Sequence, residues 1–64
     1  MFDNKIIGTR ISTLRRAAGL TQAELADQLG VTHQAVSQWE RGDTFPDITM
    51  LPLIASKLST DLNH

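Results

Sequence analysis

Residues 20–42 read LTQAELADQLGVTHQAVSQWERG, and this stretch decides the fold. The segment TQAE at residues 21–24 is a capping box, in which the threonine hydroxyl and the glutamate carboxylate each satisfy a free backbone N–H at a helix start. Leu20 and Leu25 have the spacing of a hydrophobic staple around that start. Gly30 is suited to the left-handed conformation that commonly ends a helix. This pattern predicts a short helix that ends just before Gly30.

A second helix is predicted immediately after the first. Thr32 is placed to cap its start and Gly42 to end it. Only residues 30–32 connect the two helices, which is too short a link for them to run antiparallel at full length. Such a link suits two helices that cross at a steep angle, the helix-turn-helix arrangement. We assign residues 21–41 to this unit, with Trp39 in the core rather than on the surface as a stacking platform.

A further helix is predicted before the unit, over about residues 4–18. Asp3 or Asn4 is placed to cap its start, and Gly19 to end it. Its apolar residues recur along one stripe: Ile7, Ile11, Leu14 and Ala18.

The last helix is predicted to follow its cap, Asp47, and to run to about Leu58. Pro52 would then fall near its fifth position, where the missing N–H kinks or shortens a helix. Because alternating β-branched runs are absent, we expect an all-α, compact four-helix domain. Asp61 is placed to cap a fifth helix that is cut off, so we expect a minimal protein or a fragment without its C-terminal domain. The predicted apolar stripe of the last helix is Ile48, Leu51, Ala55 and Leu58.

Size and composition exclude several classes of protein. The 64 residues form one domain, 1–64, without room for both a core and an active-site cleft. No nucleophile–base–acid set and no cysteine are present, and His33 and His64 are the only histidines, so we expect no enzyme, no metal and no cofactor. The chain shows no signal peptide and no run of ~20 apolar residues, which predicts a cytoplasmic protein without a membrane partner.

The charge is distributed unevenly along the chain. Six basic and seven acidic residues give a net charge of −1, whereas nucleic-acid binders are usually basic. Residues 1–20 nevertheless hold four of the basic residues against Asp3 alone, which predicts one positive face. Those four are Lys5, Arg10, Arg15 and Arg16.

The outer face of the second helix in the unit carries the chemistry. None of its polar residues is acidic, so phosphates would not repel it, and a glutamine amide can make two hydrogen bonds to an adenine edge in the major groove. An amide-rich surface helix without a ligand would have the same composition, so this face alone leaves both interpretations open. The face, here named the polar ridge, consists of His33, Gln34, Ser37, Gln38 and Arg41.

The wider pattern resembles the phage-repressor and Cro-type helix-turn-helix family. The resemblance rests on residues 20–42, where the capping box, the turn glycine, the final ERG and two hydrophobic staples occur together. The staples are Leu20 with Leu25 and Val31 with Val36. It extends over IGTRISTLRRAAG before this stretch and PDITMLPLIASKL after it, about residues 6–58 in all. It implies a sequence-specific, DNA-binding transcription regulator, expected to be a repressor, whose partner is double-stranded DNA and which commonly forms a homodimer.

The resemblance also implies a role for individual residues. The recognition helix would place its first turns against base edges, while free N–H groups at helix starts would hold phosphates. An exposed histidine, a first-turn residue and an arginine at a negative helix end are the simpler interpretations of positions 33, 22 and 41. Base contacts are implied for His33, Gln34, Ser37 and Gln38, and phosphate contacts for Gln22, Thr32, Arg41 and Thr44.

Three further expectations concern structure and partners. Arg15 and Glu40 match positions that form a partly buried, structural ion pair in the family, and losing either partner should be costly. Met50 and Leu53 lie off the main stripe of the last helix, as candidates for self-association or for packing against absent residues. The acidic balance favours one alternative function, a protein-interaction module such as an antitoxin that binds its toxin.

Overall fold

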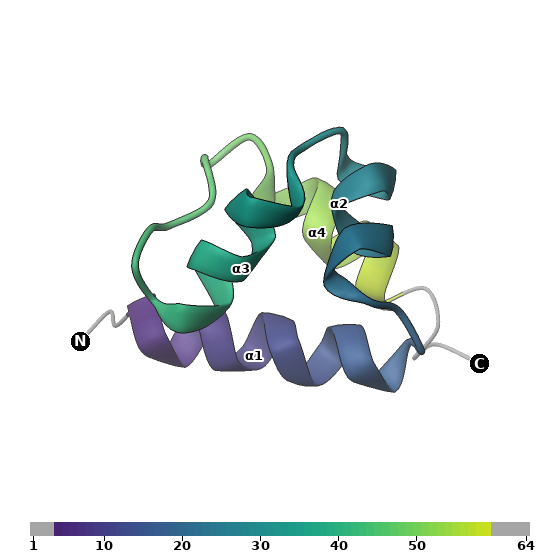
Figure 1. Cartoon of the computed structure of the whole chain (residues 1–64), viewed down its shortest axis with the longest axis horizontal. Coiled ribbons are helices and arrows are strands. Elements are labelled where there is room, and N and C mark those ends of the chain that lie inside the picture. The colour runs from purple at the N-terminus through teal and green to yellow at the C-terminus, as the bar shows by residue number, and fades with distance from the viewer. Residues whose placement is uncertain (1–3, 60–64) are drawn as a thin grey trace.

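A computed structural model describes residues 4–59, and within this range all regular structure is helical. α1 runs along one side of the molecule, and the three other helices pack above it (Figure 1). The predicted all-α fold and the helix-turn-helix unit are confirmed. The helices are α1 (Asn4–Ala17), α2 (Gln22–Leu29), α3 (His33–Arg41) and α4 (Leu51–Ser59).

α2 and α3 begin and end where the capping residues predict. Thr21 Oγ1 accepts from the Glu24 N–H at 3.0 Å, and Glu24 Oε1 accepts from the Thr21 N–H at 2.8 Å, which completes the capping box. Thr32 caps α3 by accepting from the backbone N–H three residues later, at 3.1 Å. Gly30 and Gly42 end the two helices with φ of 73° and 81°, the left-handed region in which glycine avoids steric cost.

The N-terminal half of α1 packs closely against the end of α3. A Cβ atom at Gly8 would overlap the carbonyl oxygen of Trp39 and lie 2.8 Å from that of Glu40, so the two backbones approach too closely for a side chain. At Gly42 a Cβ atom would meet the side chain of Lys5. The start of α1 therefore lies beside the end of α3, as Figure 1 also shows.

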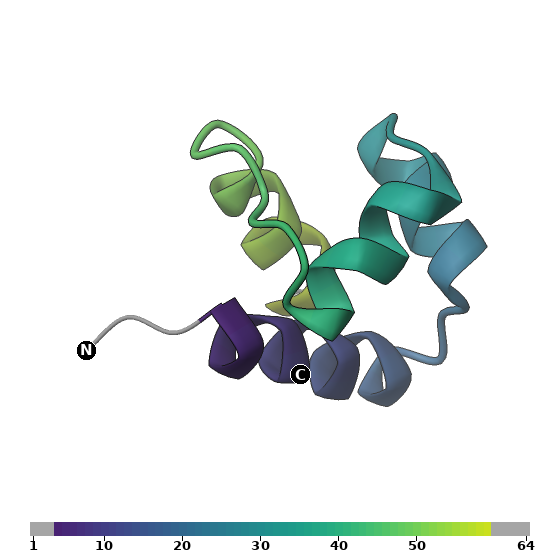
Figure 2. The same ribbon diagram turned by 60° about the vertical axis from the view of Figure 1, so that its left-hand side comes forward.

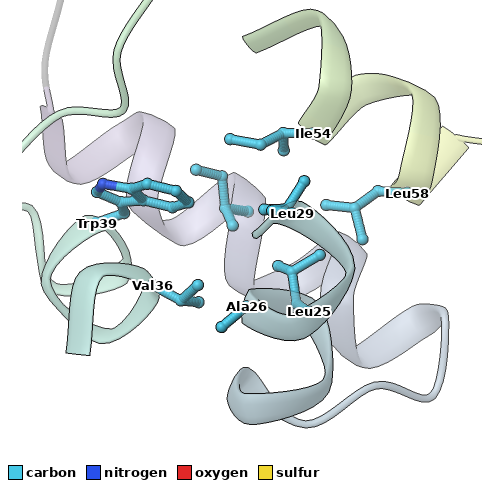
Figure 3. Close-up of a cluster of buried hydrophobic side chains, with 8 residues drawn as sticks. Leu25, Ala26, Leu29, Val36, Trp39, Ile54 and Leu58 are labelled. Carbon is cyan, nitrogen blue, oxygen red and sulfur yellow. The ribbon is translucent and has the colours of Figure 1, made fainter. Parts of the chain in front are cut away.

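A single core joins all four helices (Figure 3). Trp39 is only 6% exposed, which confirms its predicted place in the core. α2 and α3 cross beside α4, so that each contributes to the same cluster (Figure 2). Burial of a side chain such as leucine or isoleucine stabilises the fold by about 1.5–3 kcal/mol. The cluster consists of Ile11, Leu25, Ala26, Leu29, Val36, Trp39, Ile54 and Leu58.

The predicted start of the last helix is wrong, and its apolar stripe is right for Leu51 and Leu58 but wrong for Ile48 and Ala55. α4 begins at Leu51, so Ile48 lies before the helix and is 78% exposed. Ala55, also assigned to the stripe, is exposed, whereas Ile54 is buried together with Leu58. The two buried residues of α4, Ile54 and Leu58, are therefore four residues apart, and both pack into the core.

The segment before α4 explains the error. Asp47 Oδ1 accepts from the backbone N–H and the hydroxyl of Thr49, both at 2.9 Å, so it caps a turn and not the helix. Pro52 is the second residue of α4, where its missing N–H breaks no helical hydrogen bond and no kink follows. Of the two candidates for self-association, Met50 is half-buried against the core, whereas Leu53 is 48% exposed.

Smaller differences concern the ends of the chain. α1 ends at Ala17, one residue earlier than expected, and Gly19 follows with a φ of 75°. Asn4 is the first residue of α1 that the structure describes. The alternative cap Asp3 and the proposed fifth-helix cap Asp61 lie outside the described residues. In the described part of the chain, no helix is both long and apolar enough to cross a bilayer.

Candidate nucleic-acid interface

The polar ridge lies on the side of α3 that faces away from the core. His33, Gln34 and Arg41 are exposed, and Ser37 and Gln38 are half-buried. All five belong to a single helix whose ends are fixed by a threonine cap and a left-handed glycine. The ridge is therefore a continuous surface on a rigid element, with donors and acceptors but no carboxylate.

The first residues of α2 and α3 lie next to each other. His33 Nε2 and Gln22 Oε1 are 3.0 Å apart, so these two side chains, predicted separately, form one contact. Thr32 precedes this contact and is exposed. The starts of two helices thus meet at one end of the ridge, where free N–H groups and the positive ends of the helix dipoles favour an anion.

Gln22 also connects the ridge to the interior. Its Nε2 atom donates to Glu40 Oε1 at 2.9 Å, across a sequence separation of 18 residues. Its carbonyl oxygen, on the other side of the amide, faces His33. No local sequence pattern indicates this link, because it joins residues on two helices that meet only in the folded chain.

Arg15 and Glu40 form an ion pair between α1 and α3. Arg15 Nε lies 2.7 Å from Glu40 Oε2, and the exposed fractions of the two side chains are 10% and 7%. A second guanidinium nitrogen donates to Glu40 Oε1 at 3.1 Å, and the third donates to the carbonyl oxygen of Leu20 at 2.8 Å. The pair therefore ties together α1, α3 and the start of the helix-turn-helix unit.

The carboxyl group of Glu40 is held in its charged form. Burial alone would raise its pKa, but hydrogen bonds from Arg15 and Gln22, together with the charge of Arg15, lower the pKa below the ordinary value of 4.5. At neutral pH Glu40 is thus a carboxylate that only accepts hydrogen bonds.

Arg41 has a partner that the sequence interpretation did not assign to it. Its Nε donates to Asp43 Oδ2 at 2.9 Å, with side-chain exposed fractions of 60% and 58%, and another nitrogen donates to Ser37 Oγ at 3.2 Å. The far end of the ridge therefore carries an exposed ion pair. Sequence proximity alone, two residues apart, was the available signal for it.

Thr44 lies in the loop after α3 and is exposed. Its backbone N–H points to the carbonyl oxygen of Gln38 at 3.5 Å, which keeps the loop close to the end of the helix. The residues of the candidate interface thus occupy the start of α2, the outer face of α3 and the loop that follows. Among the described residues, no three histidine, cysteine, aspartate or glutamate side chains gather in a way that could hold a metal ion.

Comparison with known proteins gives the family. Residues 11–64 match the family described as helix-turn-helix. The chain belongs to the phage-repressor and Cro-type helix-turn-helix family. The predicted resemblance is therefore confirmed, and the geometry of α2 and α3 is that of the motif after which the family is named.

Relatives of this helix-turn-helix chain carry regulatory names. The HTH-type transcriptional regulator DicA of Escherichia coli (strain K12) is 49% identical over 43 residues, which cover 67% of this chain and 32% of the relative. The transcriptional activator BcrR of Enterococcus faecalis is 35% identical over 55 residues, covering 86% and 27%. Repressor protein C2 of Salmonella phage P22 is 38% identical over 45 residues, covering 70% and 21%. The matched region thus spans at most about a third of each of these three proteins.

Proposed function

We propose that this chain is a sequence-specific DNA-binding module of a transcription regulator, which inserts α3 into the major groove of double-stranded DNA. The observation that carries the proposal is the carboxylate-free polar ridge on the outer face of α3, in a chain that belongs to a helix-turn-helix family. In this arrangement the first turns of the recognition helix meet base edges. His33, Gln34, Ser37 and Gln38 are the proposed base-contacting residues, and the role is one of binding rather than catalysis.

The proposed phosphate contacts lie at both ends of the ridge. Gln22 is suited to this role because its amide nitrogen has two hydrogens, of which the bond to Glu40 uses one. Thr32 lies at the same end, at the exposed start of α3. Arg41 and Thr44 lie at the opposite end, so a phosphate there would compete with Asp43 for the guanidinium group.

Repression is the proposed direction of regulation. The relatives include a named activator and a named repressor, so the names do not decide between these two roles. A small domain that covers a promoter blocks it without any further contact, whereas activation needs an additional contact surface. We therefore propose that the chain acts as a repressor and that it acts in the cytoplasm. We also propose that a second copy of the chain binds one turn of DNA away, at about 34 Å, which is the spacing of paired half-sites.

Relatives named as regulators give no support to the alternative of an antitoxin. The overall charge of −1 is the one feature that favours a protein partner. On the described surface the acidic residues stand outside the polar ridge, so the negative balance and the proposed DNA surface coexist in one molecule.

Selection from randomised duplex DNA at two salt concentrations tests the proposal. We expect an enriched motif with adenine-dependent positions and an affinity that falls steeply with salt, because counterions are released from phosphates on binding. Gln34→Ala and Gln38→Ala should each weaken discrimination at one position by about 1–3 kcal/mol. Gln28→Ala changes an exposed amide on α2 outside the ridge and should have no effect on the motif. Absence of any enriched motif at low salt would contradict the proposal.

A further inference from the structure

The hydrogen bonds around Gln22 determine which way its amide group faces. Glu40 is an ionised carboxylate and can only accept hydrogen bonds, so the group 2.9 Å from its Oε1 atom must be the amide nitrogen of Gln22. The opposite orientation would set the carbonyl oxygen of Gln22 against a buried negative charge. The amide oxygen of Gln22 is therefore the atom that faces His33.

This orientation in turn determines the proton on His33. An amide oxygen has no hydrogen, so the 3.0 Å contact between Gln22 Oε1 and His33 Nε2 is a hydrogen bond only if Nε2 carries a proton. A neutral imidazole has one N–H, which leaves the other ring nitrogen, Nδ1, as an acceptor. Among the described residues no hydrogen bond engages Nδ1, and the side chain is exposed on the polar ridge.

We propose that Gln22 is a positioning residue that holds His33 in the Nε2–H form, so that His33 reads an amino group on the contacted base through Nδ1. In the major groove the amino groups belong to adenine N6 and cytosine N4, whereas thymine O4 and guanine O6 accept hydrogen bonds. His33 therefore separates adenine and cytosine from guanine and thymine on the strand it contacts. A glutamine at the same position has both a donor and an acceptor and would not divide the bases in this way.

The inference rests on the proposed function for its second half only. The tautomer of His33 is a property of the free protein. Arg15 keeps Glu40 ionised, and Glu40 determines the orientation of the Gln22 amide. That amide in turn places the proton of His33 on Nε2. The preference for a base amino group requires in addition that the ridge enters the major groove. Two measurements, one without DNA and one with it, therefore separate the two halves.

The first measurement is the nitrogen NMR spectrum of the His33 ring in the full-length chain without DNA. It is made at alkaline pH in a His64→Gln background, so that His33 is the sole imidazole. We expect Nδ1 to have the shift of an unprotonated ring nitrogen. Gln22→Met, which keeps the length of the side chain but removes both hydrogen bonds, should mix in the Nδ1–H form. Gln28→Met, an exposed position on the same helix, should leave the spectrum unchanged.

The second measurement is selection from randomised duplexes with the same three proteins. At the position read by His33 we expect adenine or cytosine to be favoured over guanine or thymine by roughly two- to tenfold, the range for one hydrogen bond. Gln22→Met should reduce this ratio towards one, and Gln28→Met should retain it. A merely structural role of Gln22 would lower binding to all sequences alike and leave the ratio unchanged.

Several outcomes would overturn the inference. A wild-type spectrum with the proton on Nδ1, or a spectrum that Gln22→Met does not change, contradicts the assignment of Gln22. A selected motif in which His33 reads guanine or thymine contradicts the base preference while leaving the proposed function intact. If no motif is enriched, the proposed function fails and the base preference fails with it, and the tautomer assignment is then judged on the NMR result alone.

Discussion

The two ion pairs of α3 have nearly the same length but different surroundings. Arg15 and Glu40 are 2.7 Å apart with side chains that are 10% and 7% exposed, and they are joined through Gln22 to the start of the ridge. Arg41 and Asp43 are 2.9 Å apart at 60% and 58% exposure. The first pair fixes how helices meet, while the second leaves its guanidinium group accessible to a phosphate. Distance alone therefore does not reveal what an ion pair does; burial does.

The same contrast applies to the two halves of the chain. In the helix-turn-helix unit, side-chain hydrogen bonds from Gln22 and Arg15 meet at Glu40 and so connect α1, α2 and α3. In residues 43–59, Asp47 and Thr49 form a local contact, and Ile54 and Leu58 pack α4 into the core. Changes of the same chemical kind should therefore cost much more in the first half than in the second, unless they touch the core.

The largest effect is expected from Glu40→Ala. It leaves the buried guanidinium of Arg15 without its partner and should lower the free energy of unfolding by about 3–5 kcal/mol. For a small domain that is most of its stability, so loss of structure should precede any change in base preference. Asp43→Ala removes the exposed partner and should cost less than about 1 kcal/mol. Urea or thermal unfolding measures both variants, and an unchanged melting temperature in Glu40→Ala would contradict the role of the pair.

The next effect tests which residues of the last segment lie in the core. Ile54→Ala should destabilise the domain by about 2–5 kcal/mol, because it opens a cavity beneath α4. Ile48→Ala truncates an exposed side chain and should stay within about 0.5 kcal/mol of the wild type. If the two variants unfold at the same urea concentration, or in the reverse order, the observed docking of α4 is wrong.

A smaller difference is expected between the two capping residues. Thr32→Ala removes the acceptor for a backbone N–H at the start of α3 and should cost about 1 kcal/mol. Asp47→Ala affects only an exposed turn that precedes α4, so its melting temperature should stay close to that of the wild type. Equal losses in circular-dichroism melts would show that Asp47 supports α4 after all.

Acid should weaken the buried pair in a defined direction. Because the folded-state pKa of Glu40 is lowered, its contribution is fully present above the ordinary value of 4.5 and is lost as the pH falls through the folded-state value. Glu40→Gln cannot titrate there, so the wild type should lose more stability than this variant as the pH is lowered below 4.5. Parallel unfolding curves for the two proteins across this interval would be inconsistent with the lowered pKa.

The smallest expected effect is on DNA affinity. Asp43→Asn removes a negative charge beside Arg41 and should strengthen binding to non-cognate DNA by about two- to fivefold, consistent with the weak energy of an exposed pair. The selected motif should not change, since phosphate contacts carry no base information directly. Asp27→Asn, an exposed carboxylate at the opposite end of α2 from Gln22, is the matched control. A weaker complex for Asp43→Asn would argue that the pair positions Arg41 instead of occupying it.

Local signals explain what could be predicted from the sequence. The capping residues of α2 and α3 contact only residues close to them in the sequence, so the ends of both helices could be predicted from the sequence. These capping residues are Thr21, Gly30, Thr32 and Gly42. The start of α4 could not be predicted in this way, because an aspartate such as Asp47 can cap either a turn or a helix. Docking on the core decides between the two.

Contacts between distant segments explain the rest. The exclusion of a side chain at Gly8 depends on the backbone of α3, more than 30 residues away in sequence. The membership of the polar ridge was predictable from helical spacing, but the link from His33 through Gln22 to Glu40 was not. The sequence shows which side chains are available to such a site, whereas the fold determines which of them are in contact.

One measurement tests most directly whether the polar ridge enters the major groove. Intermolecular NOEs are recorded between the full-length chain and a selected duplex at low salt. We expect contacts from the side chains of His33, Gln34 and Gln38 to major-groove protons, such as thymine methyl groups and cytosine H5. Contacts confined to minor-groove protons, or centred on Leu53 and the exposed side of α4, would contradict it.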